Sequence, residues 1–406
     1  MSDAEIPAPV TRAVPHPFVW LVLYFPLGLA NGFPAVALGY LGIRAGLDVS
    51  SVAAIVGMTF IGGGWKFLWA PVGDYTLSRK RWYLISIAAI SAGLLAMTAI
   101  PLTRETAPVL SALTLFTIVA ATFSAFATEG LMAHNTTPAT RGRAAGWFQA
   151  GNQFGQTAGG GLALWLIVHS PAPWVGGLAL AGLLAACALA LVGLEEPPRA
   201  LAGASVGAKV GDAWRELLDV LRSRAGRIAL VLAILPIGTG AAMFLFGAIA
   251  PEFHASADVV SSVLGLGGGI VIVAGCFVGG RLADRVPKPA AYAVSCGLGL
   301  VACVVMAASP RTSASFAATT LFYIFTLGMV TASFTGLVLA IIGDTAAATK
   351  INLFFAINTL FSLGMLRAAG WAHDAWSTNG MLLTEATVGA AALVVFVLLS
   401  RRIRGR

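Results

Sequence analysis

The feature that most constrains this chain is a series of long apolar segments that recurs from near its first residue to near its last. A helix rises about 1.5 Å per residue, so about 20 apolar residues are needed to cross the roughly 30 Å hydrocarbon core of a membrane. Such segments predict twelve transmembrane spans, near residues 18–42, 52–72, 82–101, 108–131, 144–169, 174–194, 228–250, 259–280, 289–309, 314–342, 351–371 and 381–400. Because 58% of the residues are hydrophobic and only 10% are charged, no soluble core of this size could hold them.

These spans are expected to be helices. Lipid offers no partner to an unpaired backbone amide, so a spanning segment must be a helix or part of a closed barrel. The alternation of apolar and polar residues that a membrane barrel needs is absent from these segments. The expected fold class is therefore an all-α integral membrane protein with twelve transmembrane helices.

The lysine and arginine residues indicate the orientation of the spans. Short loops rich in these residues remain on the cytoplasmic side of a membrane. One side of the predicted topology carries only Arg44, Arg104 and Arg311, whereas nearly all the other lysines and arginines fall on the side that holds both chain ends. We therefore expect both termini to be cytoplasmic. The same asymmetry explains the formal charge of +8 without any nucleic-acid partner.

The sequence shows no residue pattern typical of an enzyme active site or a metal site. The four cysteines lie in apolar spans without the paired spacing of a zinc or redox site; they are Cys187, Cys276, Cys296 and Cys303. The five histidines are scattered along the chain, and no nucleophile constellation forms. We predict that the protein is not an enzyme and holds no cofactor.

One sizeable polar stretch, residues 195–227, divides the chain into two halves, 1–194 and 228–406. Within it, apolar residues recur at helical spacing between Val210 and Leu221, with arginines on the other faces. This pattern predicts a short amphipathic helix on the inner membrane surface, where anionic lipids would attract it.

The two halves share a short repeat. The segment Trp69–Asp74, at the end of the second span, is echoed by Gly279–Arg285, at the end of the eighth. Asp74 and Asp284 are 210 positions apart, which is close to half the chain. Duplication of a six-helix unit is the simplest explanation, and it predicts two six-helix bundles related by an internal pseudo-repeat.

These motifs resemble a known family. Small residues followed by Asp and then Arg or Lys, in the loop after the second helix, resemble the signature loop of the major facilitator superfamily. The segments Leu27–Pro34 and Lys66–Pro71 are similar to those of the AmpG-like muropeptide permeases, and Glu129 falls where that family places an acid in its fourth helix. Acetyl-coenzyme A and siderophore transporters share this broader grouping. The resemblance implies two bundles around one central cavity that opens alternately to each side.

On this resemblance the signature loops act as gates. Asp74 and Asp284 would accept hydrogen bonds from helix amides or from nearby arginines and hold one side shut. The candidate arginines of the gate are Arg79, Arg81, Arg281 and Arg285. For Arg79 and Arg81, simple anchoring at the membrane edge is an equally good explanation.

Charged side chains within the spans are candidates for function, because each is costly in hydrocarbon unless it faces a cavity or a partner. We identify Glu129, Lys66 and Arg367 as such residues. A carboxyl group in a partly dry cavity can load and release a proton, so Glu129 is the candidate proton-coupling residue. Its place near the end of the fourth span also fits a gate or interfacial residue.

The remaining candidates concern the substrate. Lys66 and Arg367 suggest an anion, although Lys66 could instead pair with Glu129. Amide side chains suggest a hydrophilic cargo, and the alternative for them is hydrogen bonding between helices. The amide candidates for substrate binding are Asn31, Asn152, Gln156 and Asn358, and Gln149 and Gln153 share the stripe of the fifth span.

We therefore expect a proton-coupled symporter of the bacterial inner membrane, monomeric and surrounded by lipid, that moves a small polar or anionic metabolite such as a muropeptide. The proton gradient would be its only driving force. Two alternatives remain open: transport of a siderophore or another organic anion, and a scaffold protein that transports nothing.

Overall fold

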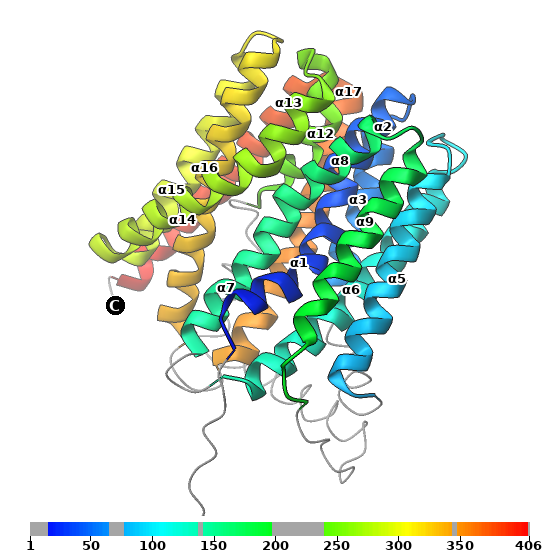
Figure 1. The fold of residues 1–406 in the computed structure, drawn as a ribbon. Coiled ribbons are helices and arrows are strands. Elements are labelled where there is room, and N and C mark those ends of the chain that lie inside the picture. The colour runs from blue at the N-terminus through cyan, green and yellow to red at the C-terminus, as the bar shows by residue number, and fades with distance from the viewer. Residues whose placement is uncertain (1–14, 65–76, 137–140, 197–238, 343–346, 405–406) are drawn as a thin grey trace, which may run out of the picture.

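The computed structural model describes residues 15–64, 77–136, 141–196, 239–342 and 347–404, and the regular structure within these ranges is helical (Figure 1). Eight of these helices, counted as continuous segments, are long and apolar enough to cross a membrane, and two shorter apolar helices accompany them. Large apolar side chains also lie exposed on the outside of the helices, for example Val192, Ile270, Phe277 and Val394. An exposed apolar surface of this extent suits lipid as the surrounding solvent.

The first group of helical segments runs from residue 18 to residue 191. In chain order it consists of α1 (Phe18–Phe33), η1 (Pro34–Leu38), α2 (Gly39–Arg44), α3 (Val49–Gly64), α5 (Arg79–Ala99), α6 (Ala107–His134), α7 (Arg141–Phe154), η3 (Gly155–Gly159), α8 (Gly160–His169), α9 (Pro173–Ala188) and η4 (Leu189–Leu191). Both η1 and η3 are π-helical insertions, so α1–η1–α2 and α7–η3–α8 each form one long interrupted helix.

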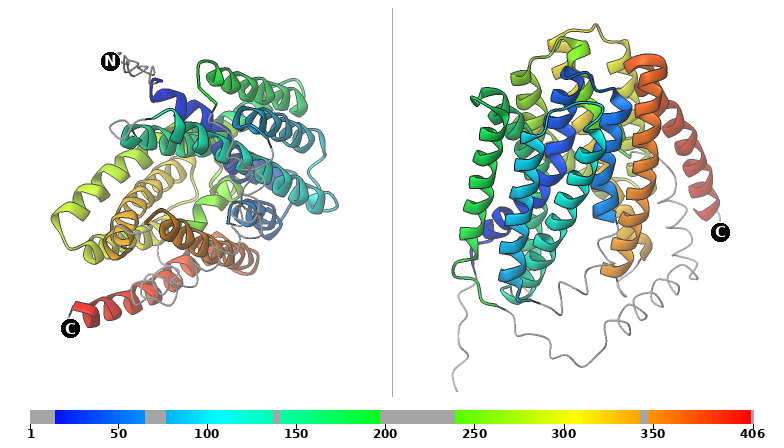
Figure 2. Two further views of the ribbon diagram at one scale, coloured as in Figure 1. Left: turned by 90° about the horizontal axis from the view of Figure 1, so that it is seen from below. Right: turned by 90° about the vertical axis from the view of Figure 1, so that its right-hand side faces the viewer.

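The second group begins at residue 241. It consists of η5 (Ala241–Leu245), α12 (Phe246–Ile249), η6 (Ala250–Phe253), α13 (Ala257–Ser261), η7 (Ser262–Gly267), α14 (Gly268–Arg285), α15 (Lys288–Ala308), α16 (Ser313–Ile342) and α17 (Ala347–Arg404). The last of these contains a backbone kink at Trp376 and Ser377, where the chain turns back on itself (Figures 1 and 2). The described parts of the spans expected from the sequence lie within these helical segments, apart from a few residues at their ends. Residues 65–72 of the second expected span and 228–238 of the seventh lie outside the described residues, so the count of twelve stays a prediction.

The loops identify the two ends of the molecule. We call the end that carries Arg44, Arg104 and Arg311 the Arg44 end, and the opposite end, where α5 begins and α14 finishes, the Arg79 end (Figure 1). The start of the predicted linker lies at the Arg79 end, where both carboxylate oxygens of Glu196 accept from backbone amides of α5, at 2.5 Å from Arg79 and 3.2 Å from Lys80. The rest of that linker, with its predicted helix, lies outside the described residues.

The tightest packing in the first group joins α1 to α7 and η3. A Cβ atom on Gly28 would lie 2.2 Å from the carbonyl oxygen of Asn152, and one on Gly32 would lie 1.9 Å from that of Gln156. Only glycine permits such backbone contact between two helices. The first and fifth predicted spans are therefore held together along their length, and this contact positions the candidate site.

Candidate functional site

The predicted proton residue, Glu129, lies on α6 and is half-buried. The hydroxyl group of Tyr24, on α1, donates a hydrogen bond to its Oε1 at 3.3 Å. The ring of Tyr24 in turn stacks on Phe148 of α7, with 3.5 Å between the ring centroids. The acid therefore lies where α1, α6 and α7 meet, and a tyrosine locked by stacking presents a donor to it.

The backbone of α1 is fixed beside this acid by two hydroxyl groups. The carbonyl oxygen of Leu23 accepts from Tyr83 of α5 at 3.1 Å and from Thr128 of α6 at 3.4 Å. Tyr83 and Thr128 are both buried. Three helices thus converge one residue away from Tyr24 and from Glu129, which gives the pair a rigid support.

A predicted gate arginine lies next to the same acid. A Cβ atom on Gly130 would lie 2.7 Å from Nε of Arg79, so the guanidinium group packs against the residue that follows Glu129. The backbone of Arg79 is held by Glu196, and Ser78 caps α5 by accepting from the amide of Arg81 at 3.3 Å. The structure therefore places the guanidinium group of Arg79 against the neighbour of Glu129 in α6, whereas the side chain of Arg81 is exposed.

The amide side chains predicted to bind substrate differ in their hydrogen bonding and packing. The side chain of Asn31 donates to the carbonyl oxygen of Leu27 at 3.0 Å, within its own helix. Asn152 has a buried Oδ1 with no hydrogen-bond partner among the described residues. Gln156 lies on η3, against Gly32. An unsatisfied buried acceptor is costly, and a ligand or water that donates to it would recover that cost.

Several predicted residues cannot be compared with the structure. Lys66 and Asp74 lie outside the described residues, as do the side chains of Gln149 and Asn358. A pair between Lys66 and Glu129 therefore stays a prediction. Arg367 is described: its side chain is exposed on α17, and no hydrogen bond or ion pair joins it to another described residue.

The second gate loop differs in detail from the prediction. Asp284 forms an ion pair with Lys288, at 3.5 Å, and not with Arg281 or Arg285. Lys288 is the first residue of the next helix, α15, and its Nζ also donates to the carbonyl oxygen of Ala283 at 2.8 Å. Arg281 and Arg285 are exposed at the end of α14. The tight turn before α15 brings the lysine back over Asp284, which explains the exchange of partner.

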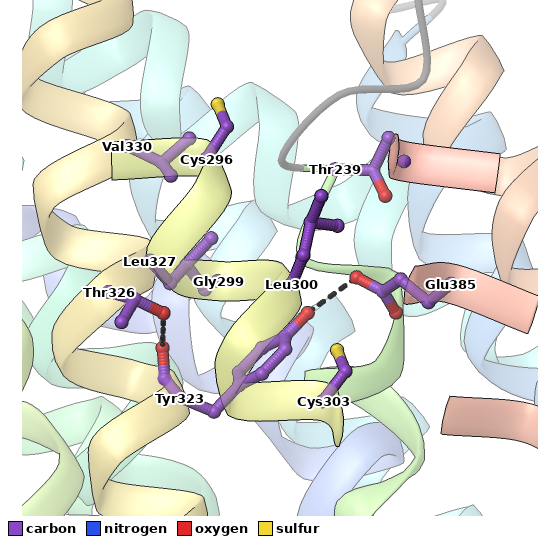
Figure 3. Close-up of a pocket in the computed structure, with 12 residues that line it drawn as sticks. Thr239, Cys296, Gly299, Leu300, Cys303, Tyr323, Thr326, Leu327, Val330 and Glu385 are labelled. Atoms are coloured by element: carbon purple, nitrogen blue, oxygen red, sulfur yellow. Dashed lines mark hydrogen bonds between the residues drawn. The ribbon is translucent and has the colours of Figure 1, made fainter. Parts of the chain in front are cut away.

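One buried acid was missed from the sequence. Glu385 lies on α17 and is 6% exposed, and its Oε1 accepts from the hydroxyl of Tyr323 at 2.6 Å (Figure 3). Its Oε2 accepts from the backbone amide of Ala242 at 2.7 Å. The available signal was its place inside the predicted span 381–400.

The two groups of helices contact each other at the Arg44 end. A Cβ atom on Gly247 of α12 would lie 2.6 Å from the carbonyl oxygen of Ala35 in η1. The hydroxyl of Tyr40 donates to the carbonyl oxygen of Ala255 at 3.4 Å, and His169 lies 3.5 Å from the carboxylate of Asp258. Backbone contacts, a hydrogen bond and an imidazole–carboxylate contact therefore close this end of the structure.

No group of three or more potential ligands could hold a metal ion within the described ranges. The four cysteines are free thiols, three of them buried. The chemistry that the described site offers is therefore proton exchange at a carboxyl group and hydrogen bonding by amides and hydroxyls.

Comparison with known proteins agrees with this arrangement. The chain is 26% identical to the anhydromuropeptide permease of Escherichia coli strain K12 over 407 aligned positions, which cover 91% of this chain and 78% of the permease.

Solved structures share the fold. A bacterial homologue of the human lysosomal transporter Spinster, in an inward-facing and unoccupied conformation, aligns over 95% of this chain and 96% of its own, with a TM-score of 0.73 and 14% identity. A D-xylose–proton symporter aligns over 94% of this chain and 95% of its own, with a TM-score of 0.70 and 13% identity.

The sequence profile of the Major Facilitator Superfamily matches residues 20–369, which is most of the chain. The helical fold, the apolar exterior and the solved relatives agree with that match. This chain is a multi-pass membrane transporter that belongs to the Major Facilitator Superfamily.

Proposed function

We propose that this protein is a proton-coupled symporter that moves anhydromuropeptides across the bacterial inner membrane. The observation that carries the coupling is the Glu129–Tyr24 pair, a half-buried acid at the junction of three helices with a positioned donor. The cargo follows from the similarity to the anhydromuropeptide permease. A disaccharide or sugar with an attached peptide offers hydroxyls, amides and carboxylates, which suit Asn152, Gln156 and Arg367.

In this proposal the carboxyl of Glu129 exchanges a proton with water, while Tyr24 stabilises its charged form by donating a hydrogen bond. Cargo binds between the two groups of helices, against the buried Oδ1 of Asn152 and the exposed guanidinium of Arg367. The contacts at the Arg44 end then open while the Arg79 end closes, so that the site faces one side at a time. Asp74, Asp284 and the neighbouring arginines take part in closing the Arg79 end.

The same proposal includes the organisation of the chain. Residues 1–194 and 228–406 form the two moving bundles, and residues 195–227 join them in the cytoplasm. Both termini are cytoplasmic, as the distribution of lysine and arginine suggests. The working unit is a monomer, because one chain supplies both bundles.

Uptake of a radiolabelled anhydromuropeptide into proteoliposomes with an imposed pH gradient tests this function. Wild-type protein is expected to accumulate the compound, and Glu129→Gln to exchange it across the membrane without responding to the gradient, because Gln keeps an acceptor for Tyr24 but cannot lose a proton. Glu105→Gln, which changes an exposed acid in the loop before α6, is the matched control and should behave as wild type. Gradient-driven accumulation by Glu129→Gln would remove the proton role from this residue.

A further inference from the structure

A second acid lies within the helices of the C-terminal half. Glu385 of α17 lines a pocket with residues of α15 and α16 and with Thr239 and Gly240, which precede η5 (Figure 3). It is 6% exposed, so its carboxyl group is removed from bulk solvent. Among the described residues, the lining of this pocket includes no residue of the loop around Asp284 or of the site around Glu129.

The groups that face Glu385 are donors and neutral acids. Tyr323 of α16 donates to Oε1 at 2.6 Å, and the amide of Ala242 in η5 donates to Oε2 at 2.7 Å. The other titratable groups that line the pocket are Cys296 and Cys303 of α15. No lysine, arginine or histidine is among the described residues of the lining. A buried carboxylate that lacks a cation is stabilised by its hydrogen bonds alone, so it binds a proton when those bonds weaken.

The amide that Glu385 binds belongs to a short helix that begins after a left-handed residue. Gly240 adopts a left-handed conformation, with φ of 67°, and the 3₁₀ helix η5 starts directly after it. The first amides of any helix lack partners within that helix, and Ala242 is one of these. Glu385 therefore caps η5 from a different helix, with a charge-assisted hydrogen bond.

The capped segment leads to the closed end of the molecule. Helix α12 follows η5 without a break, and its Gly247 makes the close contact with Ala35 of η1. Ala242, where Glu385 caps η5, is thus five residues before Gly247, which makes the contact between the two groups of helices. The short segment η5–α12 is the connection between the buried acid and the Arg44 end.

We propose that Glu385 is a second proton-binding site of this transporter, and that its charge state controls the segment η5–α12 and through it the closure of the Arg44 end. The charged carboxylate holds the amide of Ala242 and keeps the contact at Gly247. When an oxygen of Glu385 takes a proton from water, the neutral acid caps η5 less strongly, and the Arg44 end is freer to open. This inference rests on the transport function proposed above.

Infrared spectroscopy of the purified, substrate-free protein tests the proton site directly. As pH falls, wild-type protein is expected to gain the carbonyl band of a buried carboxylic acid, which Glu385→Gln lacks and Glu129→Gln retains. In Tyr323→Phe the band should remain but should form at higher pH, because the charged form has lost a donor. Identical pH-difference spectra for wild type and Glu385→Gln would overturn the proposal, and so would an unmoved titration in Tyr323→Phe.

Closure of the Arg44 end is measured on the same protein with a pair of spin labels. The labels are attached to cysteines introduced at the exposed residues Ala45 and Ala314, one in each half at the Arg44 end, and the distance between them is determined. Glu385→Gln at high pH should give the wider distance distribution that wild type shows at low pH, because Gln imitates the neutral acid. A distribution that equals that of wild type at every pH would contradict the link to closure. Neither measurement uses cargo, so failure of the anhydromuropeptide assignment leaves both results interpretable.

Discussion

At the scale of single residues, Arg367 gives the sharpest test of what the protein carries. Its guanidinium is exposed and makes no hydrogen bond or ion pair within the described part of the chain, so it is available to a carboxylate of the cargo. A charge-assisted hydrogen bond contributes about 1.5–3 kcal/mol, which corresponds to a change in Kd of roughly 10- to 150-fold. Arg367→Ala should weaken binding of an anhydromuropeptide by about this factor in isothermal titration calorimetry.

Arg367→Lys is the matched variant, because lysine keeps the charge but not the planar pair of donors. Its Kd is expected to lie between those of wild type and Arg367→Ala. Equal Kd values for all three proteins would place the anion-binding group elsewhere.

The sequence could indicate Glu129, because an acid inside an apolar span is costly and therefore informative. It could not indicate Tyr24 as its partner, since 105 positions separate the two residues and only the packing of α1 against α6 joins them. Glu385 could have been indicated on the same ground, because it lies inside the predicted span 381–400. The kink at Trp376 and Ser377 precedes it, and its side chain is buried within the helix that follows.

At the scale of helices, the start of α3 offers a test of stability. The side chain of Asp48 accepts a hydrogen bond from the amide of Ser51 at 3.1 Å, as an N-cap residue does. Hydrogen bonding by Ser51, from its side chain first and from its backbone amide second, lowers the pKa of Asp48 below its usual value. Because the pKa is lower in the folded state, the stability that the bond gives is fully present above the unfolded pKa of about 3.9 and is lost as pH falls toward the lower, folded value.

Asp48→Ala should therefore lower the free energy of unfolding by about 0.5–2 kcal/mol near neutral pH, and this difference should shrink below about pH 4. Asp48→Asn keeps a capping oxygen and should lose less. Thermal unfolding in detergent across this pH range measures both variants. A deficit for Asp48→Ala that stays the same at low pH would contradict the role of the charged cap.

The helices themselves were largely predictable, because twelve apolar runs can only be buried in a membrane as helices. Their interruptions were not. The π-helical segments η1, η3 and η7 and the left-handed residue Gly240 before η5 depend on contacts with other helices, and periodicity along one segment carries no such information. The exchange of partner at Asp284, from the arginines to Lys288, likewise depends on how the chain turns into α15.

At the scale of the whole molecule, the structure shows one conformation of the transporter, in which the two groups of helices are in contact at the Arg44 end. A methyl group on Gly247 would meet the backbone of η1, which has little room to give. Overpacking of this kind costs about 1–3 kcal/mol, so Gly247→Ala should shift the population away from the closed form by roughly 5- to 150-fold.

Spin labels at Ala45 and Ala314 would report this shift as a longer mean distance in Gly247→Ala. Gly280→Ala is the control, because no atom lies within 4 Å of the position that its Cβ would occupy. An unchanged distance in Gly247→Ala would mean that the contact between α12 and η1 does not control closure.

In the proposed function, movement of cargo and movement of protons are one coupled process. This coupling is measured most directly as the pH of a weakly buffered suspension of proteoliposomes, with no imposed gradient, as an anhydromuropeptide is added outside. The outside medium is expected to become more alkaline as cargo enters, and Glu129→Gln is expected to abolish this signal. Entry of labelled cargo with no change in pH would contradict the coupling.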